Sequence, residues 1–525
     1  MRSRLSIYYT YGIIALWAIA CFVFFQVFYS YHFFYKEQTQ LFLFSADYLN
    51  TYFSKPAWLA CMGGDFLTQF FYYRFAGAAI LTIVLLLLGD FTRRSFERCL
   101  CGRFSFVIAL VVMTVEAIFY FRADFRLSSA AALIGSMGLF LLYCLICKEW
   151  IKWVVAVAFV ILAYWMFGYG CFVFVLLVVL HDIGQPKGWI KLVLFVLAAG
   201  FPLSMRAHYL LTWQTSLSYP GVGEFQKPNF TLEKILALDN EYYFGNYDKV
   251  LNIVHQSDAS LPEVSYFYNL VQARRGLLPD SLLNITQQPR GLFMKLGPNA
   301  SMIDLYIGGE VFNFCGDMTF DEHSAMLASV FSYQNRNARM IKRLAEVNLV
   351  NNDTAAALKY LRILQKTFVY RKWAALRMPD SQAPTVKEIL QQKRQYINRL
   401  DTLRGAENYR LVLAGLLHSN PQNIAALDYL LCDDLLRKDI SSFKRDYDTF
   451  YLLRSKRLYQ EALLIYLAGT KAKPEECAKY HISGSLLKDF NEYTAIYAQT
   501  KGNRWALRDK FGHTYWYYFH FMNKR

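Results

Sequence analysis

Charged side chains are scarce in this sequence, and long apolar runs are missing from roughly its last three hundred residues. Only 18% of the 525 residues are charged, whereas 55% are apolar and 17% are aromatic. Seven apolar runs lie before about residue 205, and none of comparable length follows them. This distribution excludes a soluble enzyme with a simple tail. The sequence predicts an integral membrane protein that carries one large water-facing domain.

The sequence also lacks the spacings of a disulfide framework and of a metal centre. Its ten cysteines are scattered, and the large domain holds an odd number of them, Cys315, Cys432 and Cys477. Cys144 and Cys147 have no second pair or histidines nearby to complete four metal ligands. The net charge of +16 is spread along the chain and follows from membrane topology. We therefore expect no cofactor and no nucleic-acid partner, and a divalent metal is left open as an alternative that no motif supports.

Each apolar run can be compared with the roughly 17 to 25 helical residues that cross a bilayer. The predicted spans are Tyr8–Tyr29, Phe66–Gly89, Phe104–Phe121, Leu127–Cys147, Trp153–Phe167, Tyr169–Leu180 and Trp189–Leu203. The fifth and sixth come from one stretch, Ile151–His181, which is too long for one straight span and short for two. Gly168 and Gly170 predict a hairpin there, because glycine accepts the positive φ of such a turn. One tilted helix is the alternative.

The orientation follows from Lys and Arg in the short loops, which stay preferentially on the cytoplasmic side. One side holds Arg2, Arg4, Arg93, Arg94, Arg98, Arg103, Lys148, Lys152, Lys187 and Lys191, and the other holds Lys36, Lys55, Arg74, Arg122 and Arg126. This bias predicts a cytoplasmic N-terminus. An odd number of spans then places the large domain on the far side. Without the glycine hairpin, that domain would be cytoplasmic.

The connection between the first two spans, about residues 30–65, is too aromatic for a solvated linker. Its aromatic residues are interspersed with polar ones, which favours a helix lying at the membrane surface. Pro56 is expected to break this helix, and Gly63-Gly64 is expected to form the bend into the second span. An interfacial rim that seals the bundle is the structural interpretation of this segment.

A functional interpretation starts from acidic residues expected on the same outer side, namely Glu37, Asp47, Asp65 and Asp124. Glu116 lies inside the third apolar run, where an ionised carboxylate is strongly disfavoured unless it is paired or hydrated. We expect Arg74 and Arg122 to be its partners. A purely structural ion pair inside the bundle is the alternative to a functional site.

This arrangement resembles the C-type membrane glycosyltransferases (GT-C), which take sugar from a polyprenyl-phosphate carrier at the outer face. The resemblance rests on a seven-span module, an acidic first outer loop and a second outer acid. It implies a base or acceptor-orienting role for Glu37, or for Asp47 or Asp65, and a second polar or metal-linked role for Asp124. Substrate-binding roles fall to Glu116 and to Arg74, Arg122 and Arg126, whose cations suit a phosphate leaving group.

Three phrases also resemble a multi-pass inner-membrane family of Bacteroidota that has no assigned activity. They are LFLFSADYL and KPAWLACMGGDFLTQFFYY in the first outer loop and TYWYYF near the C-terminus. The resemblance implies a bacterial inner membrane, and the orientation predicted from the loop charges then makes the large domain periplasmic. It supplies no mechanism.

The predicted domains are a transmembrane bundle at 1–205, a linker at 206–230 and an α-helical repeat domain at 231–525, so the predicted fold class is all-α. Four helix–turn–helix signatures recur in the last domain, around residues 244–250, 275–281, 352–357 and 438–443. Their spacing resembles the tetratricopeptide repeat (TPR), and Asn420-Pro421 is similar to a boundary between two units. A plain all-α bundle is the alternative.

Two functions from different classes remain open. One is a transferase that acts on a lipid-linked sugar at the outer face. The other is an envelope scaffold whose spans anchor a protein- or peptide-binding solenoid, and a transporter ranks third. The aromatic C-terminal segment from His513 to Phe521 is expected to cap the solenoid, with docking on lipid as the alternative.

Overall fold

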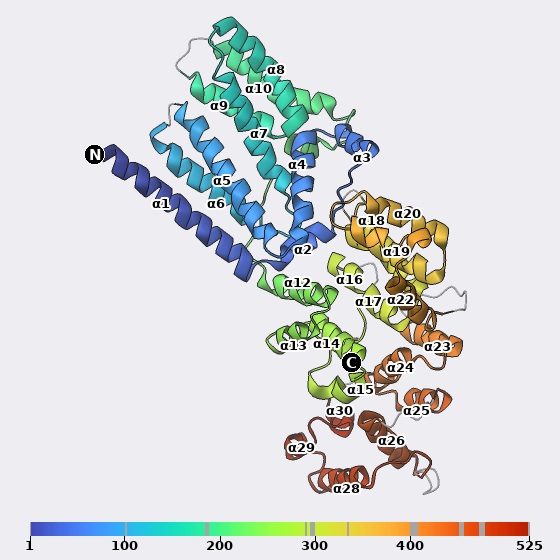
Figure 1. Cartoon of the computed structure of the whole chain (residues 1–525). Coiled ribbons are helices and arrows are strands. Elements are labelled where there is room, and N and C mark those ends of the chain that lie inside the picture. The colour runs from blue at the N-terminus through green and yellow to red at the C-terminus, as the bar shows by residue number, and fades with distance from the viewer. Residues whose placement is uncertain are drawn as a thin grey trace. The chain divides into compact units, whose positions relative to one another are not determined.

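The structure is a computed structural model of the chain that describes residues 2–99, 102–183, 188–288, 291–294, 300–332, 335–398, 408–450, 456–471 and 478–522. These ranges form helices and turns and contain no β-strand (Figure 1). The predicted all-α fold class is confirmed. Lys187 and Cys477, which entered the predictions of topology and disulfides, lie outside the described residues.

The chain divides into two compact units. Unit 1 consists of Met1–Leu236, Ser332–Arg339 and Leu361–Ala375, and unit 2 consists of Ala237–Phe331, Met340–Tyr360 and Leu376–Arg525. Unit 1 thus includes two short segments from the later part of the chain that no sequence signal marked. The segment at 206–230 contains a helix of its own, α11 (Trp213–Ser218). The predicted domain boundaries stay a prediction.

Seven helices of unit 1 correspond to the apolar runs. They are α1 (Arg2–Val23, continued by the π-helical turn η1, Phe24–Phe28), α5 (Ala76–Glu97), α6 (Ser105–Phe119), α7 (Leu127–Tyr143), α8 (Glu149–Phe167), α9 (Gly170–His181) and α10 (Gly188–Met205). Four stretches are long and apolar enough to cross a membrane, namely Tyr8–Phe28, Ala76–Glu97, Glu149–Phe167 and Gly188–Met205. Because α6, α7 and α9 are shorter, seven spans stay a prediction.

The second apolar helix begins later than predicted. Residues expected at its start belong to α4 (Trp58–Thr68) and to the 3₁₀ turn η3 (Gln69–Tyr72), and α5 starts at Ala76. The predicted bend at Gly63-Gly64 is also wrong, because both glycines lie inside α4. The reason is packing: a Cβ on Gly64 would lie 2.6 Å from the backbone nitrogen of Ser128 in α7. Gly64 therefore permits close helix contact rather than a turn.

The predicted hairpin between α8 and α9 is present. Gly168 has φ +60°, and its N–H donates to the carbonyl of Tyr164 at 2.9 Å. A Cβ at Gly168 would lie 2.1 Å from the carbonyl oxygen of Tyr219, so glycine is required for space as well as for backbone conformation. The stretch from residue 149 to 181 is two helices, not one tilted helix.

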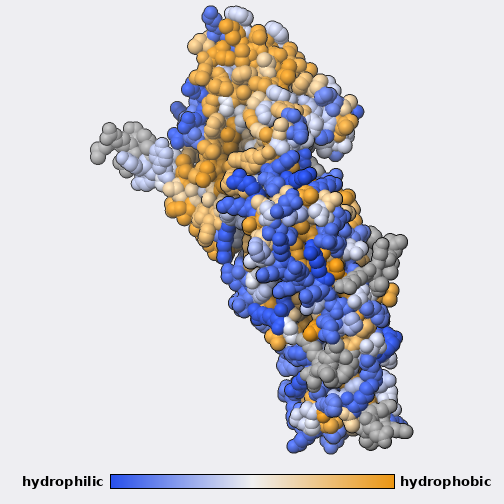
Figure 2. Space-filling model, turned by 45° about the vertical axis from the view of Figure 1, so that its right-hand side comes forward, coloured by the Kyte–Doolittle hydropathy of each residue, from blue (hydrophilic) through white to orange (hydrophobic). Residues whose placement is uncertain are grey.

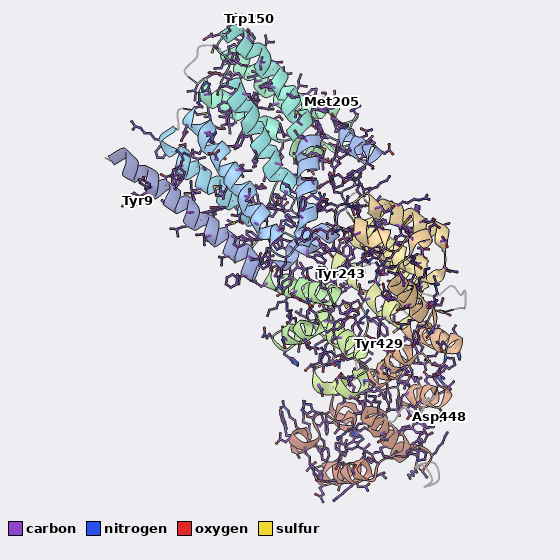
Figure 3. The ribbon with its side chains drawn as sticks, viewed as in Figure 1. Tyr9, Trp150, Met205, Tyr243, Tyr429 and Asp448 are labelled. Atoms are coloured by element: carbon purple, nitrogen blue, oxygen red, sulfur yellow. The ribbon has the colours of Figure 1, made fainter. Side chains whose placement is uncertain are left out.

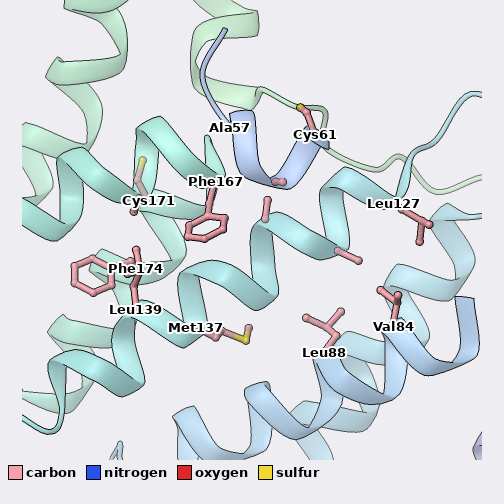
Figure 4. Close-up of a cluster of buried hydrophobic side chains, with 14 of the residues drawn as sticks. Ala57, Cys61, Val84, Leu88, Leu127, Met137, Leu139, Phe167, Cys171 and Phe174 are labelled. Atoms are coloured by element: carbon pink, nitrogen blue, oxygen red, sulfur yellow. The ribbon is translucent and has the colours of Figure 1, made fainter. Parts of the chain in front are cut away.

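The core of unit 1 is centred on α7, which packs against α4, α5, α8 and α9. Buried side chains such as Leu88, Met137 and Phe174 fill it (Figure 4). Phe167 packs directly over Gly135 of α7, where a Cβ would lie 2.0 Å from the ring. Small residues at such crossings allow helix axes to approach closely, as in membrane bundles.

The outward faces of unit 1 are apolar. Leu16 of α1, Val111 of α6 and Leu192 of α10 expose 69%, 55% and 66% of their surface. Hydrophobic surface gathers over this unit, whereas unit 2 presents a largely hydrophilic surface (Figure 2). Trp150, which is 70% exposed, and Met205 lie near the beginning of α8 and at the end of α10 (Figure 3). These helices could span a membrane by length and composition.

Unit 2 is built from short helices joined by tight turns. Three helices cross between the units: α12 (Phe230–Tyr243) and α19 (Ala338–Asn351) begin in unit 1, and α20 (Thr354–Gln365) ends there. The helices described wholly within unit 2 include α13 (Tyr247–His255), α14 (Pro262–Arg274), α15 (Leu278–Ser281), α16 (Met302–Ile307), α17 (Gly309–Cys315), α18 (Met318–Phe331), α22 (Pro384–Arg394), α23 (Tyr409–Ser419), α24 (Ile424–Leu436), α25 (Ile440–Thr449), α26 (Arg457–Thr470), α28 (Gly484–Gln499), α29 (Arg504–Phe511) and α30 (Tyr515–Phe521). Figure 3 marks Tyr243 at the end of α12, Tyr429 on α24 and Asp448 on α25.

All four predicted helix–turn–helix signatures separate two helices. Each turn contains a residue with positive φ, namely Gly245, Gly276, Asn352 and Lys438. This conformation ends a helix and lets the next one start at an angle. Asn420-Pro421 likewise lies between α23 and α24, which pack against each other. The helix pairing is therefore present, and the relation to TPR repeats stays a prediction.

The first half of the aromatic C-terminal segment, from Thr514 to Tyr517, is buried in unit 2. Tyr515 and Trp516 are fully buried, and both are held by Glu461 of α26. The side-chain carboxylate of Glu461 accepts the backbone N–H of Tyr515 at 2.7 Å. The backbone carbonyl of Glu461 accepts the indole N–H of Trp516 at 2.9 Å. Phe490 and Leu507 complete this cluster. The arrangement matches the expected cap rather than an aromatic tail free to dock on lipid.

The contact at Gly64 gives a matched pair of substitutions. We expect Gly64→Ala to lower the unfolding free energy of the detergent-solubilised protein by about 1–3 kcal/mol, because the added Cβ overlaps the α7 backbone. Gly63→Ala is the control, since nothing lies within 4 Å of its Cβ and alanine favours helix by about 1 kcal/mol. Thermal unfolding followed by circular dichroism measures both. Equal midpoints for the two variants would contradict the α4–α7 contact.

Candidate functional site

The outer segment, residues 30–65, folds as several short helical pieces rather than one long surface helix. α2 (Tyr31–Gln38), α3 (Ala46–Asn50) and the 3₁₀ turn η2 (Thr51–Ser54) precede Pro56 and α4. Backbone hydrogen bonds tie the segment to the later parts of unit 1. The N–H of Phe44 donates to Lys366 at 2.7 Å, and the N–H of Ala338 donates to Gln40 at 3.1 Å. These bonds fix the positions of the predicted acids.

Glu37 is buried at the end of α2, with 3% of its surface exposed. The Tyr370 hydroxyl lies 2.9 Å from both of its carboxylate oxygens, and the Gln38 amide donates to one of them at 2.6 Å. The cavity that Glu37 lines has a volume of about 10 Å³. That volume accommodates about one water molecule. Its lining includes none of the other predicted site residues.

Asp65 lies in α4 and faces a second group of partners. Its carboxylate accepts the Tyr52 hydroxyl at 2.8 Å and lies 3.7 Å from the Arg126 guanidinium. Burial raises the pKa of Asp65, while Arg126 and the Tyr52 hydrogen bond lower it. Tyr52 also contacts the hydroxyl of Tyr48 at 2.9 Å. The carboxylate is thus connected to a short chain of buried hydroxyls.

Lys36, which the sequence suggested only as a topology signal, is a buried cation of the outer segment. Its Nζ lies 4.3 Å from the centre of the Tyr120 ring and has no hydrogen-bond partner among the described residues. Burial lowers the pKa of Lys36 to about 7, Asp124 opposes that shift, and Arg126 adds to it. The aromatic residues that precede Lys36 in the sequence and Glu37 that follows it are a local signal that could have indicated its burial.

The second outer connection forms a separate ion pair. Arg122 binds Asp124 at 2.7 Å and also contacts Glu224. The Arg122 guanidinium lowers the pKa of Asp124, which is otherwise exposed. The predicted pairing of Arg122 with Glu116 is therefore wrong, because Arg122 is engaged by nearer acids. Glu116 is buried in α6, where Ser129 is its hydrogen-bonding neighbour.

Of the eight predicted site residues, the structure joins two pairs, Asp65 with Arg126 and Asp124 with Arg122. Asp47 and Arg74 are both exposed, so neither is drawn into the buried network. Arg74 therefore does not serve as the predicted partner of Glu116. The predicted convergence is partial: Lys36 is influenced by Asp124 and Arg126, but Glu37 binds Tyr370 instead.

A further buried contact involves residues that sequence reasoning missed. His32 of α2 is 1% exposed, and its ring lies 3.7 Å from the carboxylate of Glu233 in α12. Burial lowers the pKa of His32, and Glu233 partly offsets this effect. The same carboxylate accepts the N–H of Tyr31, where negative charge suits the start of α2. Among the described residues, no group of three His, Cys, Asp or Glu side chains is placed to hold a metal ion.

The lowered pKa of Lys36 gives a pH-dependent prediction. Between about pH 7 and 10.5 the Lys36 amine is mostly protonated in the unfolded chain and mostly neutral in the folded one. Because the unfolded state then binds more protons, the unfolding free energy rises with pH in that window. We expect Lys36→Met to be more stable than the parent by about 2 kcal/mol at pH 6.5, with the gain shrinking toward pH 10. Unfolding midpoints in detergent at both pH values measure it. The exposed Lys227→Met is the control, and a pH-independent gain for Lys36→Met would argue against a buried ammonium.

Comparison with known proteins identifies the chain at the family level. No curated protein and no solved structure matches it. One family model matches residues 6–522, and therefore covers nearly the whole chain. The protein belongs to the family of unknown function DUF6057.

Proposed function

We propose that the chain is a multi-pass membrane protein whose helices anchor a helical binding domain, as a scaffold does. In this proposal α6, α7 and α9 cross the membrane together with the four longer stretches. The N-terminus lies in the cytoplasm of a bacterial cell, and unit 2 lies on the outer side of the inner membrane. The apolar outward faces of unit 1 support the membrane assignment. The loop charges support the orientation.

The state of Glu37 is the observation that favours a scaffold over a transferase. A general base needs a free carboxylate oxygen within reach of its substrate hydroxyl. Both oxygens of Glu37 lie within hydrogen-bond distance of Tyr370, and the adjoining cavity has room for about one water rather than a sugar. Asp124 is already paired with Arg122. These contacts hold the outer segment in place, which is a structural role.

The construction of unit 2 supports the binding role. Its helices are short and joined by turns with left-handed residues, as in TPR-like repeats. Such arrays present side chains from successive helices and bind peptides or proteins more often than they perform chemistry. Exposed apolar residues such as Leu411 of α23 and Ile424 of α24 provide contact area for a partner. Membrane lipid and a protein or peptide are the partners this proposal requires.

A GT-C-like transferase is the second candidate, and Lys36 is the observation in its favour. An amine with a pKa near 7, flanked by Arg126 and Asp124, resembles a site that receives a phosphate group. In this scheme Lys36 and Arg126 hold the polyprenyl phosphate, and Asp65 or Asp124 takes the proton of the acceptor hydroxyl. The outer segment would have to open to admit these substrates.

Reporter fusions test the membrane placement. We expect a periplasm-specific reporter such as alkaline phosphatase to be active at the C-terminus and inactive at the N-terminus, because seven spans place the ends on opposite sides. A cytoplasm-specific reporter should give the reverse pattern and serves as the control. Activity of one reporter at both ends would refute an odd number of spans.

A pair of variants separates the scaffold from the transferase. The triple variant Glu37→Gln, Asp65→Asn and Asp124→Asn removes the candidate bases but keeps their shapes. Leu411→Glu with Ile424→Glu places charge on exposed apolar surface of unit 2. In cells, we expect the triple variant to replace the wild-type gene fully, whereas the charged pair behaves as the gene deletion.

Mass spectrometry of polyprenyl-linked sugars supplies the second readout of this experiment. If the protein is a scaffold, the triple variant has the same amount of polyprenyl-linked sugar as the wild type. An enlarged pool of lipid-linked sugar in the triple variant, matching the deletion, would establish the transferase instead. Membrane levels of both variants, measured by immunoblot, show whether any loss of function comes from degradation.

A further inference from the structure

A cavity of about 470 Å³ lies in unit 2, next to the aromatic C-terminal helix. It is lined by α29 and α30, which are neighbours at one end of the unit, and by residues 283–287 (Figure 1). Its volume falls in the range of about 300–1,000 Å³ that is usual for small-molecule sites. Its position is independent of every residue assigned to the membrane function above.

The charged groups of this cavity are all basic. Arg504 and Arg508 lie one helical turn apart on α29, and His513 follows them. Among the described residues that line the cavity there is no Asp or Glu. Each guanidinium carbon lies 5.2 Å from the centre of the Trp505 ring, a cation–π contact that leaves the positive charge of both arginines in place. Two guanidinium groups without a carboxylate partner in the lining favour an anion between them.

An unpaired buried hydroxyl points to the same conclusion. Tyr517 lines the cavity and is 6% exposed, yet its hydroxyl has no hydrogen-bond partner among the described residues. The adjacent tyrosines of α30 are satisfied: Tyr515 donates to the Leu435 carbonyl at 3.0 Å, and Tyr518 donates to the Leu436 carbonyl at 2.9 Å. Because a buried hydroxyl without a partner is disfavoured, Tyr517 has a donor available for a ligand.

The remaining walls are mixed in polarity. Leu283, Ile285 and Met522 supply apolar surface, and Asn284 and Thr286 supply amides and hydroxyls. A ligand that fits all these walls carries a negative head group and an apolar body. Free inorganic ions would leave the apolar walls unused.

We propose that this cavity binds an organic anion whose carboxylate or phosphate group is held by Arg504, Arg508 and the Tyr517 hydroxyl. The apolar body of the ligand packs against Ile285 and Met522. A guanidinium group binds a carboxylate or a phosphate through two parallel N–H donors. The feature that the two kinds of ligand share is therefore a negatively charged group with at least two oxygen acceptors. The site gives the aromatic C-terminal segment a binding role in addition to its role in the core.

Three small probes test the proposal on the full-length protein in detergent at low ionic strength. Phenyl phosphate and 3-phenylpropionate carry the two head groups, and 3-phenyl-1-propanol is the neutral control. Isothermal titration calorimetry should show binding of at least one anion and none of the alcohol. The preferred anion identifies the head group. The double variant Arg504→Ala and Arg508→Ala should weaken binding of that anion at least tenfold, as expected for loss of two charge-assisted contacts.

Two further variants separate a built site from general charge attraction. Tyr517→Phe should weaken anion binding severalfold while leaving the unfolding midpoint unchanged or higher, because the lost hydroxyl has no partner in the free protein. Lys479→Ala with Lys488→Ala removes the same charge from exposed positions that do not line the cavity, and should leave binding unchanged. The proposal is overturned if no anion binds more tightly than the alcohol, or if the lysine pair matters as much as the arginine pair.

Discussion

Unit 1 depends on one physical constraint, the apolar surface that its helices turn outward. Leu16, Val111 and Leu192 each expose more than half of their area. Against water, such surface costs about 25 cal/mol per Å². In lipid the same surface costs nothing, but every backbone polar group must then be satisfied inside a helix. The described part of unit 1 meets that requirement, because it is helical and reverses direction at tight turns such as the one at Gly168.

The features that the sequence predicted well depend on neighbouring residues. Apolar runs indicated the seven apolar helices of unit 1, and Gly168 marked the turn between two of them. The four signatures of unit 2 marked true helix ends at residues such as Gly245 and Asn352. Hydropathy could not distinguish apolar residues that face other helices from those that face outward. Phe66 therefore counted as the start of a span, although it belongs to α4, which is held by the close contact of Gly64 with α7.

The environment of the candidate site could not be predicted, because its partners are distant in sequence. Tyr370 lies 333 positions from Glu37, and Glu233 lies 202 positions from the backbone of Tyr31. No spacing rule connects such pairs, and one sequence contains no record of which residues approach each other. The sequence analysis singled out Glu116 as unusual for an apolar run and the other acids by their expected place on one side. The partners of each carboxylate determine whether it can react or is held in a structural contact, and only the folded structure identifies those partners.

The same distant contacts affect how unit 1 is assembled. Residues 332–339 and 361–375 complete this unit, and they contribute Tyr370 to Glu37 and backbone partners to Phe44 and Gln40. A bundle made of residues 1–236 alone would leave the buried Glu37 carboxylate without Tyr370, which costs more than the loss of a surface hydrogen bond. During synthesis the apolar helices emerge well before these segments, so the outer segment can reach its final arrangement only after most of the chain has been made. Unit 1 is therefore not completed by the first 236 residues alone, because its buried polar groups depend on the later sequence.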